Sequence, residues 1–151
     1  MREFLAALLI MATCALSVFA KPVAHSTASK TAVTTQQTAL ANTIWDYSRT
    51  KGNAHASYAA AKAEPELMSK LFCYCGCDVV DKMTSLLTCF QSNHSVDCSI
   101  CQDEALYAFN LKKTGSSDAE IRKQLDRHFS HLYPFTKDSE IFKKYKATAG
   151  R

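Results

Sequence analysis

The sequence lacks any sustained alternation of apolar and polar residues, the pattern that half-buried β-strands produce. Its apolar residues recur instead at the three- and four-residue spacing of helices that bury one face. A sheet is therefore not expected. We predict an all-α fold, a small helical bundle of about four helices with a cysteine-rich loop.

A clustered positive surface is also missing. The formal net charge is +4, because 18 lysines and arginines are set against 14 acidic residues, and the basic residues are scattered through the expected helices. No aromatic residues alternate with them to form a platform for bases. Nucleic-acid binding therefore has little support, and a solvated surface is the better interpretation of the charge.

No apolar run is long enough to be retained as a membrane span. The apolar segment 4–19 follows Arg2 and is shorter than the ~20 residues that a spanning helix needs. It is typical of a signal peptide, so we expect residues 1–20 to be cleaved and the mature protein to be secreted or periplasmic. Cys14 would hold the chain at a membrane only if it were lipidated, which is the less favoured alternative.

Two changes in composition divide the rest of the chain. Residues 21–43 consist mainly of Ala, Thr, Ser and Gln, and they hold too few large apolar side chains to offset the entropy of ordering. We expect a disordered spacer there. Apolar character returns at Ile44, and residues 44–145 are predicted to form one helical, cysteine-rich domain.

Capping residues mark the helices of that domain. Pro65 suits a first helical turn, Gly115 is a good C-terminal stop, and Ser117 begins a capping box. With the apolar spacing, they predict helices over residues 66–72, 78–90, 97–115 and 117–133, and a turn or two of helix over 54–63. Six side chains of these helices are expected to share one core: Leu86, Phe90, Leu106, Phe109, Leu125 and Phe129.

What the sequence does hold is cysteine at high local density, with six of its seven cysteines within residues 73–101. In an extended segment Cys73, Cys75 and Cys77 would point the same way, because residues two apart lie on one side of the chain. Gly76 permits an unusual backbone angle. The triplet is therefore predicted to form a loop or helix end whose backbone folds around something.

Cys98 and Cys101 form a second group, at an expected helix N-terminus. Residues three apart share a helix face, and the helix macrodipole favours the thiolate there. Those are the conditions for a soft-metal site or for a redox dithiol. His94 could join the same site if the chain turns before Cys98. Covalent haem attachment is excluded on its usual pattern, because Gln102 follows Cys101 where a histidine would be required.

These thiols favour an extracytoplasmic metal-binding protein without catalytic turnover, so no catalytic residue is assigned. Thiolate ligands select copper(I) or zinc. Six sulfurs and an imidazole exceed the four ligands of one tetrahedral zinc, which favours a cuprous cluster or a four-ligand site beside a disulfide. The candidate ligands of the metal ion are Cys73, Cys75, Cys77, Cys89, His94, Cys98 and Cys101.

Two alternatives stay open. A disulfide-stapled helical binding module would use three bridges among six mature cysteines, for which fifteen connectivities exist. The close spacing of the triplet counts against it, because cysteines two residues apart seldom meet disulfide geometry. A thiol–disulfide oxidoreductase would use Cys98 as the nucleophile and Cys101 as the resolving thiol.

The cysteine string at residues 73–77, with the stretches 88–90 and 94–101, resembles a bacterial family of secreted proteins and lipoproteins named for a Pro-Cys-Tyr-Cys-Gly-Cys motif. The likeness covers roughly residues 64–129, and Phe72 stands where the motif has proline. The resemblance implies an extracytoplasmic location and a shared role for the cysteines. It implies no particular activity.

A weaker likeness points to the small three-helix thiol reductase domain of cytochrome c maturation. It rests on a two-cysteine motif followed by a helix, on residues 115–118 and 120–122, and on a further helix. That domain has no preceding cysteine triplet, and its dithiol lies in a different surrounding sequence. This resemblance would imply thiol–disulfide exchange at Cys98 and Cys101.

Overall fold

The computed structural model describes residues 35–148, and every regular element within that range is helical, which confirms the predicted all-α fold. Besides the helical residues 35–41, the elements are α2 (Gly52–Ala63), α3 (Pro65–Lys70), α4 (Cys77–Val80), α5 (Leu86–Cys89), η1 (Asn93–Val96), α6 (Ser99–Lys113), α7 (Asp118–Phe129), η2 (Ser130–Leu132) and α8 (Glu140–Ala147). Among these residues, no helix has the length and apolar character needed to cross a membrane.

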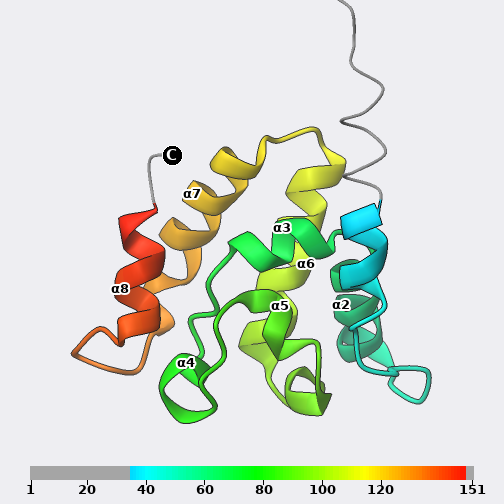
Figure 1. Cartoon of the computed structure of the whole chain (residues 1–151), viewed down its shortest axis with the longest axis horizontal. Helices are drawn as coiled ribbons and strands as arrows, with labels where there is room; N and C mark the ends of the chain where they lie inside the picture. The colour runs from blue at the N-terminus through cyan, green and yellow to red at the C-terminus, as the bar shows by residue number, and fades with distance from the viewer. Residues whose placement is uncertain (1–34, 149–151) are drawn as a thin grey trace, which may run out of the picture.

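Helix α6 lies in the middle of the molecule. It packs between α2 and α7, and Figure 1 shows α2 and residues 35–41 on one side of it, with α7 and α8 on the other. Its buried face is Cys101, Glu104, Ala105 and Ala108, which recur at helical spacing. Because two of these residues are alanines, the neighbouring helices can approach closely, and the face also carries a thiol into the core.

The predicted helices over 97–115 and 117–133 are confirmed as α6 and α7, although α7 ends at Phe129. Ser117 caps α7 as predicted, since its hydroxyl accepts the N–H of Glu120 at 3.3 Å. Gly115 lies just beyond α6 with φ +89, the left-handed angle that suits a helix stop. Local capping residues therefore determine where α6 ends and where α7 begins.

The single helix predicted over residues 78–90 is wrong. The chain forms α4 and α5 there, separated by a turn in which Lys82 takes φ 57. Ser85 then starts α5 with a capping box that it forms with Thr88. The break matters for the site, because the reversed chain brings Cys89 back beside Cys77.

Most of the predicted core is confirmed. Leu86, Phe90 and Leu125 are fully buried, and Phe129 is nearly so. Phe109 is only half-buried against the core, and Leu106 is also half-buried, because α6 presents the face of Cys101 and Ala105 inward instead. The large apolar residues of α6 therefore did not identify its buried face, which is formed by smaller side chains such as Cys101 and Ala105.

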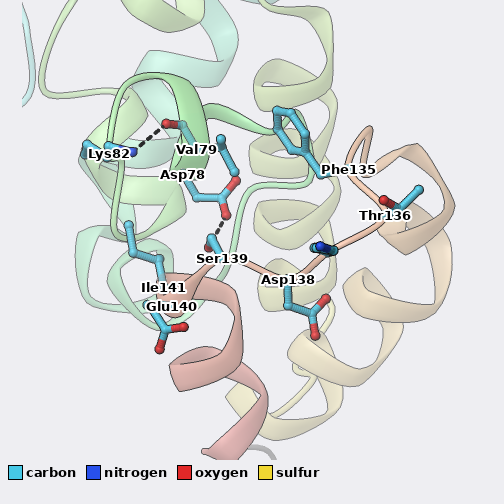
Figure 2. Close-up of a pocket in the computed structure, with 10 residues that line it drawn as sticks. Asp78, Val79, Lys82, Phe135, Thr136, Asp138, Ser139, Glu140 and Ile141 are labelled. Carbon is cyan, nitrogen blue, oxygen red and sulfur yellow. Dashed lines mark hydrogen bonds between the residues drawn. The ribbon is translucent and has the colours of Figure 1, made fainter.

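A C-terminal arm, residues 133–147, closes over the triplet and was not predicted as a separate unit. Phe142 of α8 stacks on Phe72 with ring centroids 4.4 Å apart. The buried carboxylate of Asp78 accepts hydrogen bonds from the hydroxyls of Tyr133 at 2.8 Å and Ser139 at 2.5 Å, the second drawn in Figure 2. The arm is thus anchored at both ends to residues that flank the cysteine motif.

The described residues include only part of the N-terminal region for which predictions were made. Residues 35–41 are helical and Leu40 packs against the core, so the disordered spacer expected over 21–43 does not extend to its predicted end. The signal peptide predicted over residues 1–20, with Cys14, lies outside the described residues, as do residues 21–34.

Replacing Gly76 by alanine is expected to destabilise the protein more than the same change at Gly115. Both glycines have a left-handed backbone, at φ +85 and +89, where alanine costs about 1–2 kcal/mol. At Gly76 a Cβ would also lie 2.6 Å from Pro134 Cγ, whereas nothing lies within 4 Å at Gly115. Urea unfolding of both variants measures the difference. Equal losses of stability in the two variants would contradict this expectation, because they would show that the C-terminal arm can move away from the new Cβ without a cost in free energy.

Candidate metal centre

Residues 71–76, which join α3 to α4 and which we call the motif loop, change backbone direction at each end. Leu71 ends α3 in an extended conformation, and Gly76, with φ 85, precedes the first residue of α4, Cys77. The sulfurs of Cys73, Cys75 and Cys77 lie within 4.8 Å of one another. The triplet thus forms a loop that runs into the start of a helix, as predicted, and Gly76 has the unusual backbone angle that was expected there.

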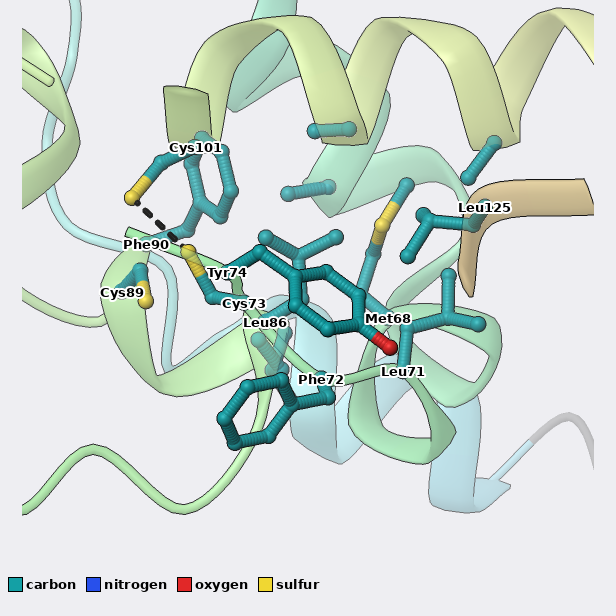
Figure 3. Packing of buried hydrophobic residues seen from close by; sticks show 14 of the residues in the cluster. Met68, Leu71, Phe72, Cys73, Tyr74, Leu86, Cys89, Phe90, Cys101 and Leu125 are labelled. Atoms are coloured by element: carbon teal, nitrogen blue, oxygen red, sulfur yellow. Dashed lines mark hydrogen bonds between the residues drawn. The ribbon is translucent and has the colours of Figure 1, made fainter. Parts of the chain in front are cut away.

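The remaining ligand candidates come from three other elements. Cys89 ends α5, His94 lies in η1, Cys98 is the N-cap of α6 and Cys101 lies in its first turn. Figure 3 shows Cys101 reaching down from α6 towards Cys73, with Cys89 beside them. Segments far apart in the sequence thus deliver their thiols to one small volume.

The sulfur atoms are in direct contact. Cys73 Sγ lies 3.3 Å from Cys101 Sγ and 3.4 Å from Cys75 Sγ, while Cys77 and Cys89 are separated by 3.4 Å. Two sulfurs that share a tetrahedral zinc at about 2.3 Å are about 3.8 Å apart. Cys75 and Cys101, at 3.7 Å, already have this separation. Small rotations of the other side chains would reach it.

All seven predicted ligands belong to this cluster, which we call the thiol cluster. Its atoms fall into four groups, in each of which the ligand atoms lie within 4.8 Å of one another: Cys73, Cys75 and Cys77; Cys73, Cys89 and Cys101; Cys77, Cys89 and His94; and Cys75, His94, Cys98 and Cys101. The described part of the chain therefore contains cysteine and histidine side chains close enough to hold a metal ion.

His94 is oriented by a partner that the sequence did not suggest. Its Nε2 lies 3.9 Å from Cys75 Sγ, and its Nδ1 lies 3.4 Å from the carboxylate of Asp81. A carboxylate behind a metal-binding histidine fixes the ring and its tautomer, and strengthens the ligand. Asp81 reaches this position because the chain turns between α4 and α5, where a continuous helix was predicted.

The protonation of the crowded thiols is coupled. Hydrogen bonds from Cys101 and then Cys73 to the sulfur of Cys75 lower the pKa of Cys75 to about 3. Donation to Cys73 and Cys75, together with burial, raises the pKa of Cys101 above its ordinary value. Although burial acts to lower it, the pKa of His94 is raised by the neighbouring thiolates, first Cys75. The cluster thus stabilises negative charge on Cys75 and favours a cation among the sulfurs.

Burial gives the thiol cluster a closed side and an open side. Cys73, Cys77, Cys89 and Cys101 are buried. Cys75, Cys98 and His94 are half-buried, and all three belong to the group that also contains Cys101. An ion entering from solvent would meet this edge first.

The same geometry bears on the two alternatives. All six cysteines among residues 35–148 are free thiols, so no bridge staples this part of the chain. The predicted dithiol does lie at the start of α6, but Cys101 is fully buried and contacts Cys73 and Cys75. Cys101 is thus part of the larger cluster and does not form an isolated redox pair with Cys98.

Two surface hollows of the described residues lie away from the thiols. One, of about 630 Å³, is lined by Asp78 and Lys82 and by residues 135–141 of the C-terminal arm (Figure 2). The other, of about 890 Å³, lies between α3, α7 and α8. Neither is lined by a cysteine, so these cavities offer no binding place for an organic substrate beside the cluster.

Glu104 is a buried acid beside the thiol cluster that sequence reasoning missed. Its Oε1 accepts the backbone N–H of Tyr74 at 2.7 Å, and its Oε2 has no hydrogen-bond partner. Burial raises the pKa of the Glu104 carboxyl well above its ordinary value, against the hydrogen bonds of Cys73 and Tyr74. This side chain ties the motif loop to α6, one turn after Cys101.

The free energy of unfolding of the variant Glu104→Gln is expected to rise relative to that of the natural protein as the pH increases above 4.5, the ordinary pKa of a glutamate carboxyl. Above that pH the unfolded chain has lost a proton that the folded state keeps, so the natural protein loses up to about 1.4 kcal/mol per pH unit. Glutamine keeps the acceptor for Tyr74 N–H and does not titrate. Urea unfolding of the reduced, metal-free protein at several pH values measures this.

The matched control for that series is Glu120→Gln, because Glu120 is an exposed acid of α7. The free energy of unfolding of the Glu120→Gln variant should change with pH in the same way as that of the natural protein. A constant difference between Glu104→Gln and the natural protein at all pH values would contradict the assignment of a protonated buried acid.

Comparison with known proteins identifies a family. The family described as "Protein of unknown function with PCYCGC motif" matches residues 4–140. No curated protein and no solved structure matches the chain, so the weaker likeness to the thiol reductase domain gains no support. The match spans the motif loop, the later cysteines and the C-terminal arm up to the first residue of α8. The chain therefore belongs to the PCYCGC-motif family.

Proposed function

We propose that this protein is an extracytoplasmic metal-binding protein that holds a soft metal, copper(I) or zinc, through cysteine thiolates. The observation that carries the proposal is the convergence of six thiols and one imidazole from separate helices and turns on one small volume. Unrelated structural demands would not gather every cysteine of the described domain in one place.

The donor set selects the class of metal. Each group in the thiol cluster consists of cysteine sulfur with or without His94, and no carboxylate is a member. Calcium and magnesium require oxygen ligands, whereas thiolate and imidazole suit copper(I) and zinc. Asp81 supports His94 from behind, in the manner of the carboxylates that orient metal-binding histidines.

The expected compartment strengthens the need for a metal. Segment 1–20 has the composition of a signal peptide, and thiols outside the cytoplasm tend to form disulfides. Pairs such as Cys73 and Cys101, with sulfurs 3.3 Å apart, would be exposed to such oxidation. A bound metal ion protects the thiolates, because their lone pairs are then engaged in coordination.

Replacing Cys75 by serine should lower the metal content of the purified protein, because this sulfur contacts Cys73, Cys101 and His94. The measurement is elemental analysis together with a free-thiol count on the same sample. His128→Ala is the control, since His128 is exposed on α7 and belongs to none of the ligand groups, and it should leave the metal content unchanged. Metal-free protein with no reactive thiol and three mapped disulfides would contradict the proposal.

Removing the metal with a chelator should also lower the melting temperature. A ligand that binds only the folded state at 1,000 times its Kd contributes about 4 kcal/mol. In a domain of about 100 residues each kcal/mol corresponds to roughly 4–8 °C. Calorimetry before and after chelation, under reducing conditions, measures the shift. An unchanged melting temperature would mean that the metal does not bind to the folded cluster.

A further inference from the structure

We propose that the thiol cluster holds four copper(I) ions in one polynuclear cluster, with each ion bound by three of the seven ligands. This inference rests on the proposed function and goes beyond it in the identity, number and arrangement of the ions. It follows from the way in which the four ligand groups share their members.

Almost every residue of the thiol cluster belongs to more than one of the four ligand groups. Every cysteine of the cluster except Cys98 belongs to two of the four groups. A thiolate sulfur has several lone pairs and can bridge two metal ions, so a sulfur that belongs to two groups can bind one ion in each. Separate mononuclear sites would need separate ligands, and these groups do not provide them.

His94 belongs to two groups as well, but an imidazole nitrogen binds only one ion. The group of Cys77 and Cys89 needs it as a third ligand, whereas the group of Cys75, Cys98 and Cys101 already has three sulfurs. Assigning His94 to the former gives four three-ligand positions: Cys73, Cys75 and Cys77; Cys73, Cys89 and Cys101; Cys77, Cys89 and His94; and Cys75, Cys98 and Cys101. Cys98 and His94 are then the terminal ligands, and the other five cysteines bridge.

Three-ligand positions suit copper(I) better than zinc, which takes four ligands at a structural site. The group of Cys75, His94, Cys98 and Cys101 alone offers four, so its rival occupant is a single zinc ion. A single zinc would leave Cys73, Cys77 and Cys89 without a metal in the buried half of the cluster. Four copper(I) ions use every ligand once or twice.

Charge is partly balanced within the loaded cluster. When all six cysteines are bound as thiolates, four copper(I) ions compensate four of their six negative charges in a region where four of the cysteines are buried, and buried charge is costly unless it is paired. Loading releases the proton of each thiol, and copper remains copper(I), so the step needs neither oxidant nor reductant.

The test is an anaerobic titration of the reduced full-length protein carrying Cys14→Ser with copper(I), against a competing copper(I) chelator. Native mass spectrometry reads the stoichiometry. We expect four copper ions per chain, taken up together because bridging sulfurs make each ion favour the next, and the luminescence of a solvent-shielded cuprous thiolate cluster. Uptake of only one or two ions would overturn the cluster but leave the proposed function standing. No uptake would overturn both.

Variants locate the ions. Cys73→Ser removes a bridge between two positions and should leave two ions, whereas His94→Ala removes one terminal ligand and should leave three. His128→Ala is the matched control, because His128 is exposed on α7 and stacks on Tyr107, and it should keep four. If Cys73→Ser fails to fold, the comparison of the two histidine variants still decides. Equal copper content in His94→Ala and His128→Ala would overturn the assignment of His94.

Discussion

The hydrogen bond from the backbone N–H of Tyr74 to the buried carboxyl of Glu104 is the interaction on which the thiol cluster depends. It holds the motif loop against α6 at a point between Cys73 and Cys75. Because Glu104 lies three residues after Cys101 on the same buried face, this bond also sets how far the sulfurs of the loop are from the sulfur on the helix. The fold thus places a costly buried acid where it positions three thiols at once.

The parts of the structure that the sequence predicted are those set by local chemistry. Apolar spacing and capping residues such as Ser117 gave α6 and α7 because helix ends are determined within a few residues. The seven candidate ligands could be named from the sequence because few side chains bind soft metals. Their convergence was expected because the cysteines lie within a short segment. The route was not, since the return of Cys89 depends on the left-handed turn at Lys82, for which the sequence has no glycine as a signal.

What the sequence did not reveal are contacts between distant residues. Asp81 faces His94, and Glu104 meets Tyr74, across separations that no local pattern encodes. The same holds for Phe72, which stands where the family motif has proline. Its ring stacks on Phe142 of α8 and so joins the motif loop to the last helix. A residue that departs from the motif is therefore one of the two anchors of the C-terminal arm.

The close approach of Pro134 and Phe135 to Gly76 has a consequence for sequence change. A side chain at position 76 would meet both residues at less than 3 Å, so neither the motif nor the arm can change there alone. In other chains of the family, a larger residue at this glycine should occur only together with a displaced or shortened arm. The two stretches, far apart in sequence, should therefore vary as one unit.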